Sequence, residues 1–161
     1  MSLFQVAKKQ EGGGGGSGYE RLCYVEYVGR DTPEIPTIKT IDTASDYSSY
    51  LSYDSTTKKF TVLQSFTALV TAWVTPYNDG GSNSNGAFYF NDTKIMSFYS
   101  PSGIGNAGGD TKLIPFNQGD TFYSYTTSDS GWPKQMLKVY KIDGITSSEA
   151  NDIVSFADEN A

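Results

Sequence analysis

Short β-prone runs separated by turn residues dominate the chain from Tyr47 onward. Each run is rich in aromatic and β-branched residues, and the residues between the runs are mostly Gly, Asn, Asp and Ser. This spacing predicts an all-β sandwich or barrel. The predicted strands are Tyr50–Tyr53, Lys59–Leu63, Phe66–Thr75, Ala87–Phe90, Lys94–Tyr99, Lys112–Phe116, Thr121–Thr126 and Gln135–Ile142.

Two further segments precede these runs. Arg21–Gly29 is predicted to form a first strand, because it is rich in Tyr and Val. Asp31–Asp42 contains two prolines close together, so we expect an extended connection or an edge segment there. The dipeptides Asn91-Asp92 and Gly119-Asp120 each lie between two strand runs, and both are predicted to close hairpins.

The run Phe66–Thr75 has two faces of different character. Its even positions are apolar as far as Val74, which predicts one buried face. The opposite face consists of Thr67, Leu69, Thr71 and Trp73. Such a face is not the polar surface of a strand that meets only water, so we expect this strand to be covered on both sides, within its own subunit or by another.

The chain has 161 residues and a mass of 17.5 kDa, enough for one well-buried core. We expect a head domain over residues 19–144, preceded by an anchoring peptide (1–11) and a Gly-rich linker (12–18) and followed by a helical tail (145–161). The net charge of −6, without a Lys/Arg-rich run, argues against nucleic acid and anionic membranes as partners. A single cysteine, Cys23, cannot form an intramolecular disulfide.

The two ends of the chain differ from the head. No signal-peptide run and no stretch of ~20 apolar residues is present, so we expect synthesis in a cytoplasm and no membrane insertion. Residues 1–11 are either a disordered terminus or an anchor that docks into another protein through Leu3, Phe4 and Val6. Thr146 and Glu149 have the spacing of a capping box, which predicts a short C-terminal helix.

The complete absence of histidine restricts the chemistry of the chain. It excludes Ser/His/Asp and Cys/His catalysis and removes the commonest transition-metal ligand, so we expect neither an enzyme nor a metal cofactor. A glycosidase needs only two carboxylates and stays open as an alternative, although the loop aspartates occupy turns where Asp is expected for backbone reasons. Calcium also stays open, because oxygen-rich loops such as residues 78–86 could supply hard ligands.

The surface composition suggests recognition. Tyr, Ser, Asn and Gly are abundant, a mixture typical of adaptable binding surfaces. The candidate ligand-binding residues are Tyr123, Tyr125, Asp129 and Trp132. Aromatic rings beside Asp would suit stacking on sugars, which makes a glycan a candidate ligand. The alternative is that these aromatic side chains fill the core or a subunit interface.

The order of elements resembles complement/tumour-necrosis-factor-type jelly-roll domains over roughly Tyr47 to Ile142. The matching segments are KKFTVLQSFTALVTAWV, FYFNDTKI, LIPFNQGDTFYSY and MLKVYKI. Within them, the family's aromatic-Thr-Val step corresponds to Phe60-Thr61-Val62, its mid-domain hairpin contains Asn91, and its late Gly-Asp step is Gly119-Asp120, preceded by Leu113 or Ile114. The resemblance is nearest to variants found in bacteriophage and prophage fibre-tip or head-decoration proteins.

The resemblance implies a homotrimer in which one sheet of each subunit faces the three-fold axis, with Phe66, Leu69 and Trp73 as candidate interface residues. It also implies a virion protein: a jelly-roll head on a phage capsid or fibre that contacts other virion proteins through its N-terminal peptide and binds host surface glycan or protein. The alternative is a free, lectin-like carbohydrate-binding module of a bacterial surface system.

Overall fold

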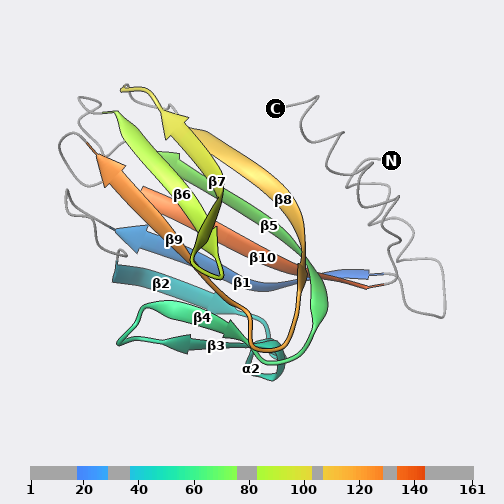
Figure 1. Ribbon diagram of the computed structural model, residues 1–161. Helices are drawn as coiled ribbons and strands as arrows, with labels where there is room; N and C mark the ends of the chain where they lie inside the picture. Colours follow the sequence, from blue (N-terminus) through green and yellow to red (C-terminus); the bar gives the residue numbers. More distant parts are fainter. Residues whose placement is uncertain (1–17, 29–36, 76–82, 103–106, 129–133, 144–161) are drawn as a thin grey trace.

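The computed structural model describes residues 18–28, 37–75, 83–102, 107–128 and 134–143 (Figure 1). These residues form two five-stranded antiparallel sheets that pack face to face. Sheet A has the order β2 (Thr37–Thr43), β1 (Gly18–Val28), β10 (Lys134–Asp143), β5 (Phe66–Thr75) and β8 (Gly108–Phe116). Sheet B has the order β3 (Leu51–Asp54), β4 (Lys59–Val62), β9 (Thr121–Ser128), β6 (Ser84–Phe90) and β7 (Thr93–Ser100). The fold is the expected jelly-roll sandwich.

The predicted strands are confirmed, with small differences at their ends. The proline-containing segment ends in β2, which lies at an edge of sheet A, as expected for a strand with prolines before it. A single helical turn, α2 (Tyr47–Tyr50), precedes β3 and was not predicted. None of the helical residues among those described forms a segment long and apolar enough to cross a membrane.

Of the two predicted hairpins, one is confirmed and one is wrong. Asn91 and Asp92 have φ angles of 47° and 61° between the paired strands β6 and β7, as a primed hairpin turn requires. Gly119, with φ 92°, also lies in a tight turn. The strands on either side of that turn, however, are β8 of sheet A and β9 of sheet B. The segment therefore passes from one sheet to the other instead of closing a hairpin.

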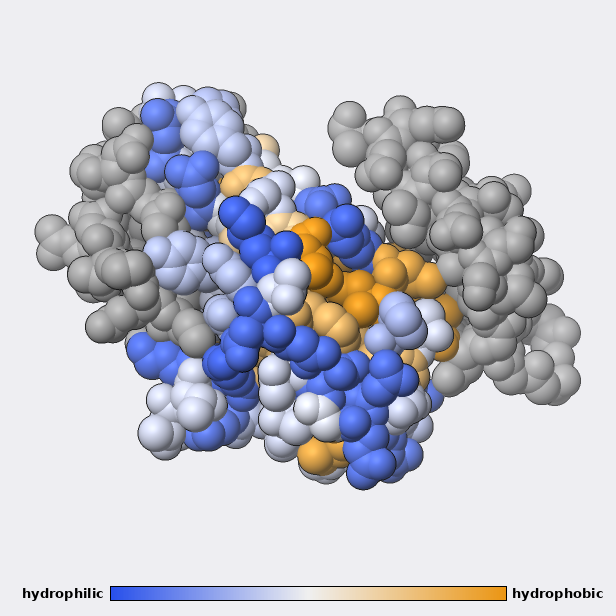
Figure 2. Space-filling model, viewed as in Figure 1, coloured by the Kyte–Doolittle hydropathy of each residue, from blue (hydrophilic) through white to orange (hydrophobic). Residues whose placement is uncertain are grey.

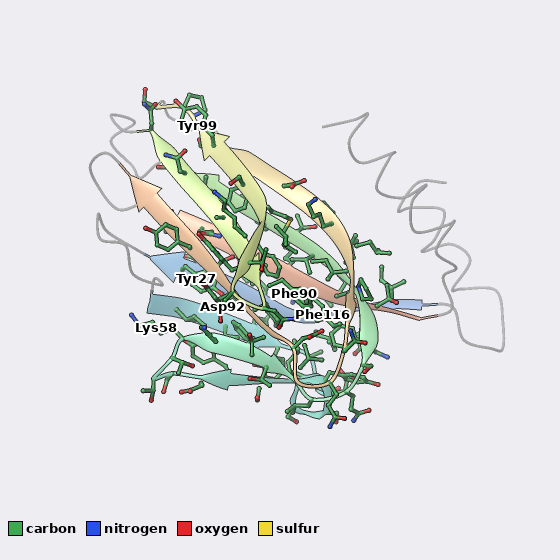
Figure 3. All side chains as sticks on the ribbon, viewed as in Figure 1. Tyr27, Lys58, Phe90, Asp92, Tyr99 and Phe116 are labelled. Atoms are coloured by element: carbon green, nitrogen blue, oxygen red, sulfur yellow. The ribbon has the colours of Figure 1, made fainter. Side chains whose placement is uncertain are left out.

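Aromatic side chains make up the centre of the core between the sheets. The rings of Phe60 and Phe122 stack at 4.9 Å with an interplanar angle of 5°, and Phe116 lies 5.1 Å from Phe122. Phe90 stacks on Phe116 at 5.3 Å, and Figure 3 shows these two side chains next to each other near the β6–β7 hairpin. The large rings therefore provide much of the buried apolar area in a chain whose apolar content is only 37%.

The open side of the sandwich, where β7 approaches β8, is closed by apolar residues. Figure 2 shows apolar residues gathered along β8 beside β7, on a face that is otherwise mostly polar. Phe98 of β7 and Ile114 of β8 are only 7% and 6% exposed. These two side chains thus close the core at this side of the sandwich.

The N-terminal peptide, residues 12–17 of the linker and the C-terminal helix lie outside the described residues, as do the anchor candidates Leu3, Phe4 and Val6. Gly18, the last residue of the predicted linker, is the first residue of β1.

Candidate functional site

The second face of strand β5 lies on the outward side of sheet A. Ala68, Val70, Ala72 and Val74 belong to the core cluster, so the other residues of the strand point away from the core. Leu69 is on that outward face, yet it is only 3% exposed. Its cross-strand partners are Tyr140 of β10 and Leu113 of β8. Large side chains thus meet on the side of the sheet that faces away from the core.

This apolar face extends along β10. Met136 pairs with Trp73, and Ile142 pairs with Thr67, so both point outward with the second face of β5. Met136 is 8% exposed and Ile142 is 5% exposed. We call the outward set Leu69, Trp73, Leu113, Met136, Tyr140 and Ile142 the outer patch of sheet A. Leu69, Met136 and Ile142 are thus covered within the single chain, whereas Trp73, Leu113 and Tyr140 are half-buried and leave part of the patch open to a partner.

A lysine lies between two aromatic rings beside the outer patch. Lys138 Nζ is 5.1 Å from the centre of the Trp73 ring and 6.0 Å from that of Tyr24. The two rings are themselves 6.4 Å apart. Cation–π contacts of this kind let a charged side chain lie within an aromatic surface. Gly109 is opposite Trp73, and a Cβ atom there would be 2.7 Å from Trp73 Cβ and 2.8 Å from the carbonyl oxygen of Ala72, so glycine allows β8 to approach β5 closely at this position.

The three trimer-interface candidates are divided between the two faces of β5. Leu69 and Trp73 lie together in the outer patch. Phe66 instead packs toward the core, where its ring is 5.3 Å from Phe116 in an edge-on arrangement and 5.6 Å from Tyr50. The physical reason is the two-residue period of a strand, which separates position 66 from positions 69 and 73.

The outward face of sheet B carries a cluster of tyrosines. Tyr123 and Tyr125 alternate with the buried Phe122, Ser124 and Thr126 along β9, so both point outward, and neither fills the core. Tyr89 of β6 stacks on Tyr123 at 4.9 Å with an interplanar angle of 3°, and meets Tyr125 edge-on at 6.4 Å. The structure thus brings two of the predicted ligand-binding residues together around a third ring. Asp129 and Trp132 lie outside the described residues.

An ion pair holds one end of this cluster. Lys59 Nζ is 2.6 Å from Asp92 Oδ1 and 5.1 Å from the centre of the Tyr123 ring. The hydrogen bond from Lys59 lowers the pKa of Asp92, and the same bond raises the pKa of Lys59. Desolvation, followed by the nearby charge of Asp92, raises the pKa of Tyr123, which keeps its phenol neutral. The charges of Lys59 and Asp92 therefore satisfy each other.

A shallow hollow of about 350 Å³ lies on the same face, toward the other end of β6 and β7. Its floor is low because Ala87 and Ser97, which pair with each other, carry small side chains. Longer side chains surround this floor: Tyr89 and Lys94 at one end, Asn85 and Tyr99 at the other, and Tyr125 at the side. Beneath it, Gly86 leaves the space that the Phe98 ring occupies, since a Cβ atom at position 86 would clash with that ring.

Sequence reasoning did not identify Asn85, Lys94 and Tyr99 as site residues. The missing information was the register of β6 with β7, which contains a bulge between the pairs Phe88–Met96 and Tyr89–Lys94. A regular strand would place Lys94 on the core side with Met96, whereas the bulge turns it outward beside Tyr89. The outward position of Tyr99, by contrast, follows from its alternation with the buried Phe98 and Ser100.

The carboxylates of Asp110 and Asp120 have structural partners. Asp120 Oδ2 accepts a hydrogen bond from the backbone N–H of Asn117 at 2.7 Å, and its Oδ1 accepts one from Asn91 Nδ2 at 2.8 Å. Asp110 Oδ1 accepts a bond from the backbone N–H of Thr111. Within the part of the chain that the structure describes, no three acidic or cysteine side chains gather as they would around a metal ion.

Comparison with known proteins supports the fold and goes no further. No family model and no curated protein matches the chain. Among solved structures, the globular domain of zebrafish complement 1qA superposes with a TM-score of 0.51 at 10% identity, covering 76% of this chain and 98% of that one. The Eiger TNF of S. frugiperda gives 0.48 at 8% identity, covering 82% and 93%. A pika GITRL gives 0.42 at 17% identity, covering 74% and 96%. The likeness to the complement 1qA domain supports the jelly-roll fold of this chain.

Proposed function

We propose that the chain is a non-enzymatic binding head. Three copies associate through the outer patch of sheet A, and the trimer is displayed on a bacteriophage capsid or fibre, where it binds host surface glycan or protein. The observation that carries this proposal is the outer patch itself. Leu69 and Met136 are already buried within the single chain, so the part of the outer patch open to another copy consists of its half-buried members Trp73, Leu113 and Tyr140.

The composition of the outer patch suits contact between copies. Aromatic residues and methionine are enriched at interface cores, and the patch contains Trp73, Tyr140 and Met136. The ammonium group of Lys138 contacts the Tyr24 and Trp73 rings, and these cation–π contacts stabilise its charge beside an interface. A closed ring of three copies would bury this surface in every subunit and leave none of it free for further growth.

Display on a virion is supported by the N-terminal sequence. A glycine-rich linker has no side chains to bury, and it tethers residues 1–11 to the head. Leu3, Phe4 and Val6 provide apolar contacts for docking into another virion protein. Three heads on one anchored trimer would gain effective concentration at a host surface that repeats its ligand.

A free carbohydrate-binding module is the second candidate, and the tyrosines on sheet B favour it. Such a module would also use Tyr123 and Tyr125 but would not need residues 1–11. Deletion of residues 1–11 separates the two functions. In the virion proposal, the shortened chain folds but no longer copurifies with phage particles. Copurification at the normal stoichiometry would reject the anchor.

Light scattering on the full chain tests the trimer. We expect a mass of about three times 17.5 kDa at micromolar chain concentration. Replacing Leu69 by Asp places a charge in the outer patch and should give monomers. The matched control is Ile41→Asp, because Ile41 is 39% exposed and lies on the edge strand β2, outside the outer patch.

Circular dichroism distinguishes loss of assembly from loss of fold in these variants. Trp73→Glu serves as a second variant, because Trp73 is less buried than Leu69 and its replacement disturbs the subunit less. A wild-type chain that stays monomeric at micromolar concentration would reject the trimer, and would shift the assignment to the free module.

A further inference from the structure

We infer that the hollow on the outward face of sheet B binds a sugar unit that carries a carboxylate. This inference rests on the proposed binding function and specifies its ligand class: an acidic glycan, held against Tyr99 and Tyr125 with its carboxylate at Lys94. It concerns the hollow between β6 and β7 rather than the stacked pair Tyr89–Tyr123.

The first observation is an exposed aromatic ring at the rim of a concave surface. Tyr99 is 51% exposed, the highest value among the large apolar and aromatic side chains that the structure describes. It forms no ring contact with the other described aromatics. Figure 3 shows it at the end of β7 that lies away from Asp92 and the hairpin. A ring held out from the core in this way contributes little to folding and is available for a ligand.

The second observation is the set of polar groups around the floor. Asn85 and Ser97 flank Ala87 on the outward face, so an amide and a hydroxyl border an apolar floor. A sugar ring has the matching character, with C–H groups that pack on aromatic faces and hydroxyls that bind amides and alcohols. The volume of about 350 Å³ is near the lower end of the range of roughly 300–1,000 Å³ for ligand pockets, which suits a small unit such as a sugar.

The third observation decides the charge of the ligand. Lys94 is the one ionised side chain among the residues that line the hollow, and no described carboxylate pairs with it. Lys59, on the same face, is instead neutralised by Asp92 at 2.6 Å. The chain as a whole has a net charge of −6, so Lys94, at the end of the hollow beside Tyr89, forms a local positive site on an acidic protein. That site complements a carboxylate.

The shape of the hollow explains how one ligand would contact all three features. Tyr89 pairs with Lys94 and Asn85 pairs with Tyr99, so the two pairs stand at opposite ends of the Ala87–Ser97 floor. A sugar lying along β7 would pack against Tyr99 and Tyr125 while its carboxylate reached Lys94. A neutral sugar would keep the stacking and lose the ionic contact.

The test uses the full chain and three probes: sialyllactose, an oligogalacturonate and an oligoglucuronate. Each is compared with its own methyl ester, which keeps the sugar and lacks the charge. Saturation-transfer NMR detects binding, and titration gives the dissociation constant. We expect at least one acidic probe to bind and its uncharged counterpart to bind about three- to fivefold more weakly, the size of an exposed ionic contact.

Three substitutions locate the bound probe. Lys94→Gln should weaken the acidic probe by the same factor and leave its uncharged counterpart unchanged, whereas Lys94→Arg should retain binding. Tyr99→Ala should weaken both by about two- to tenfold through loss of stacking. Lys112→Gln on β8 of sheet A is the matched control, since it removes the same charge outside the hollow and should leave both dissociation constants unchanged.

The inference is overturned if no acidic probe binds, if charged and uncharged probes bind equally, or if Lys94→Gln has no effect. Its failure is distinguishable from failure of the proposed function. A trimer that binds host cells equally well with and without Lys94→Gln would keep the binding head and reject the hollow as its site. A monomer that binds the acidic probes would do the reverse.

Discussion

Asn91 links the β6–β7 hairpin to the turn that precedes β9, and its replacement tests how the two are held together. Its Nδ2 donates a hydrogen bond to Asp120 Oδ1 at 2.8 Å, and its Oδ1 accepts one from the backbone N–H of Thr121 at 2.9 Å. Its own backbone N–H donates to the carbonyl of Thr121 at 2.8 Å. The residue also has a φ of 47°, a conformation that asparagine and glycine tolerate better than alanine.

Two substitutions separate these contributions. Asn91→Gly keeps the backbone conformation and removes both side-chain hydrogen bonds, so it should lower the free energy of unfolding by about 2 kcal/mol, at about 1 kcal/mol per bond. The bond to the Asp120 carboxylate is also counted at about 1 kcal/mol, below the range for bonds to charged groups, because both side chains are exposed. Asn91→Ala removes the same bonds and adds about 1 kcal/mol of left-handed strain, for a total of about 3 kcal/mol.

Urea unfolding followed by circular dichroism measures these differences, at one fixed chain concentration because self-association changes apparent stability. Asn117→Ala is the control, since Asn117 is an exposed turn residue bonded through its backbone, and it should change stability by less than about 0.5 kcal/mol. The reasoning fails if Asn91→Gly is as stable as the wild type. Equal stability of the Gly and Ala variants would reject the strain contribution alone.

Two further substitutions test the core. Phe122 is fully buried and stacks on Phe60, so Phe122→Ala should cost about 3–5 kcal/mol in urea unfolding, and a loss below about 1 kcal/mol would contradict the packing. Burial raises the pKa of the Cys23 thiol from 9.0 to about 12. Because the unfolded chain releases this proton first, stability should fall as the pH rises between these values, by up to about 1.4 kcal/mol per pH unit. Cys23→Ala should remove that part of the slope, and identical slopes would show that the thiol does not contribute.

The strands were predictable because their signals are local. In β5 and β9, buried and outward residues alternate along the chain, and the turn at Asn91-Asp92 uses residues that accept a positive φ. The pairing of strands was harder to predict, because it does not depend on local signals. Gly119-Asp120 has the chemistry of a turn, but turn chemistry does not specify whether the next strand returns beside the last one or crosses to the other sheet. Only the partners of β8 and β9 decide this.

The candidate sites divide in the same way. The outward positions of Tyr123 and Tyr125 follow from alternation with the buried Phe122 and Ser124, and the sequence did propose them as surface residues, with burial as the alternative. Lys94 could not be found, since its outward position depends on the bulge that places it beside Tyr89. A single extra residue in β7 thus turns the Lys94 side chain from the core side of sheet B to its outward face.

The two-layer architecture gives the proposed activities separate surfaces. The outer patch belongs to sheet A and the hollow belongs to sheet B, and the two sheets are separate layers of the sandwich (Figure 1). Copies that associate through sheet A would therefore leave each sheet B facing away from the contact, with three hollows presented at once. Each hollow is shallow and has a single charged contact, so one copy would bind a sugar weakly. Attachment to a surface that repeats its glycan would then depend on trimerisation, and Trp73→Glu should abolish cell attachment while leaving the affinity for a single acidic oligosaccharide unchanged.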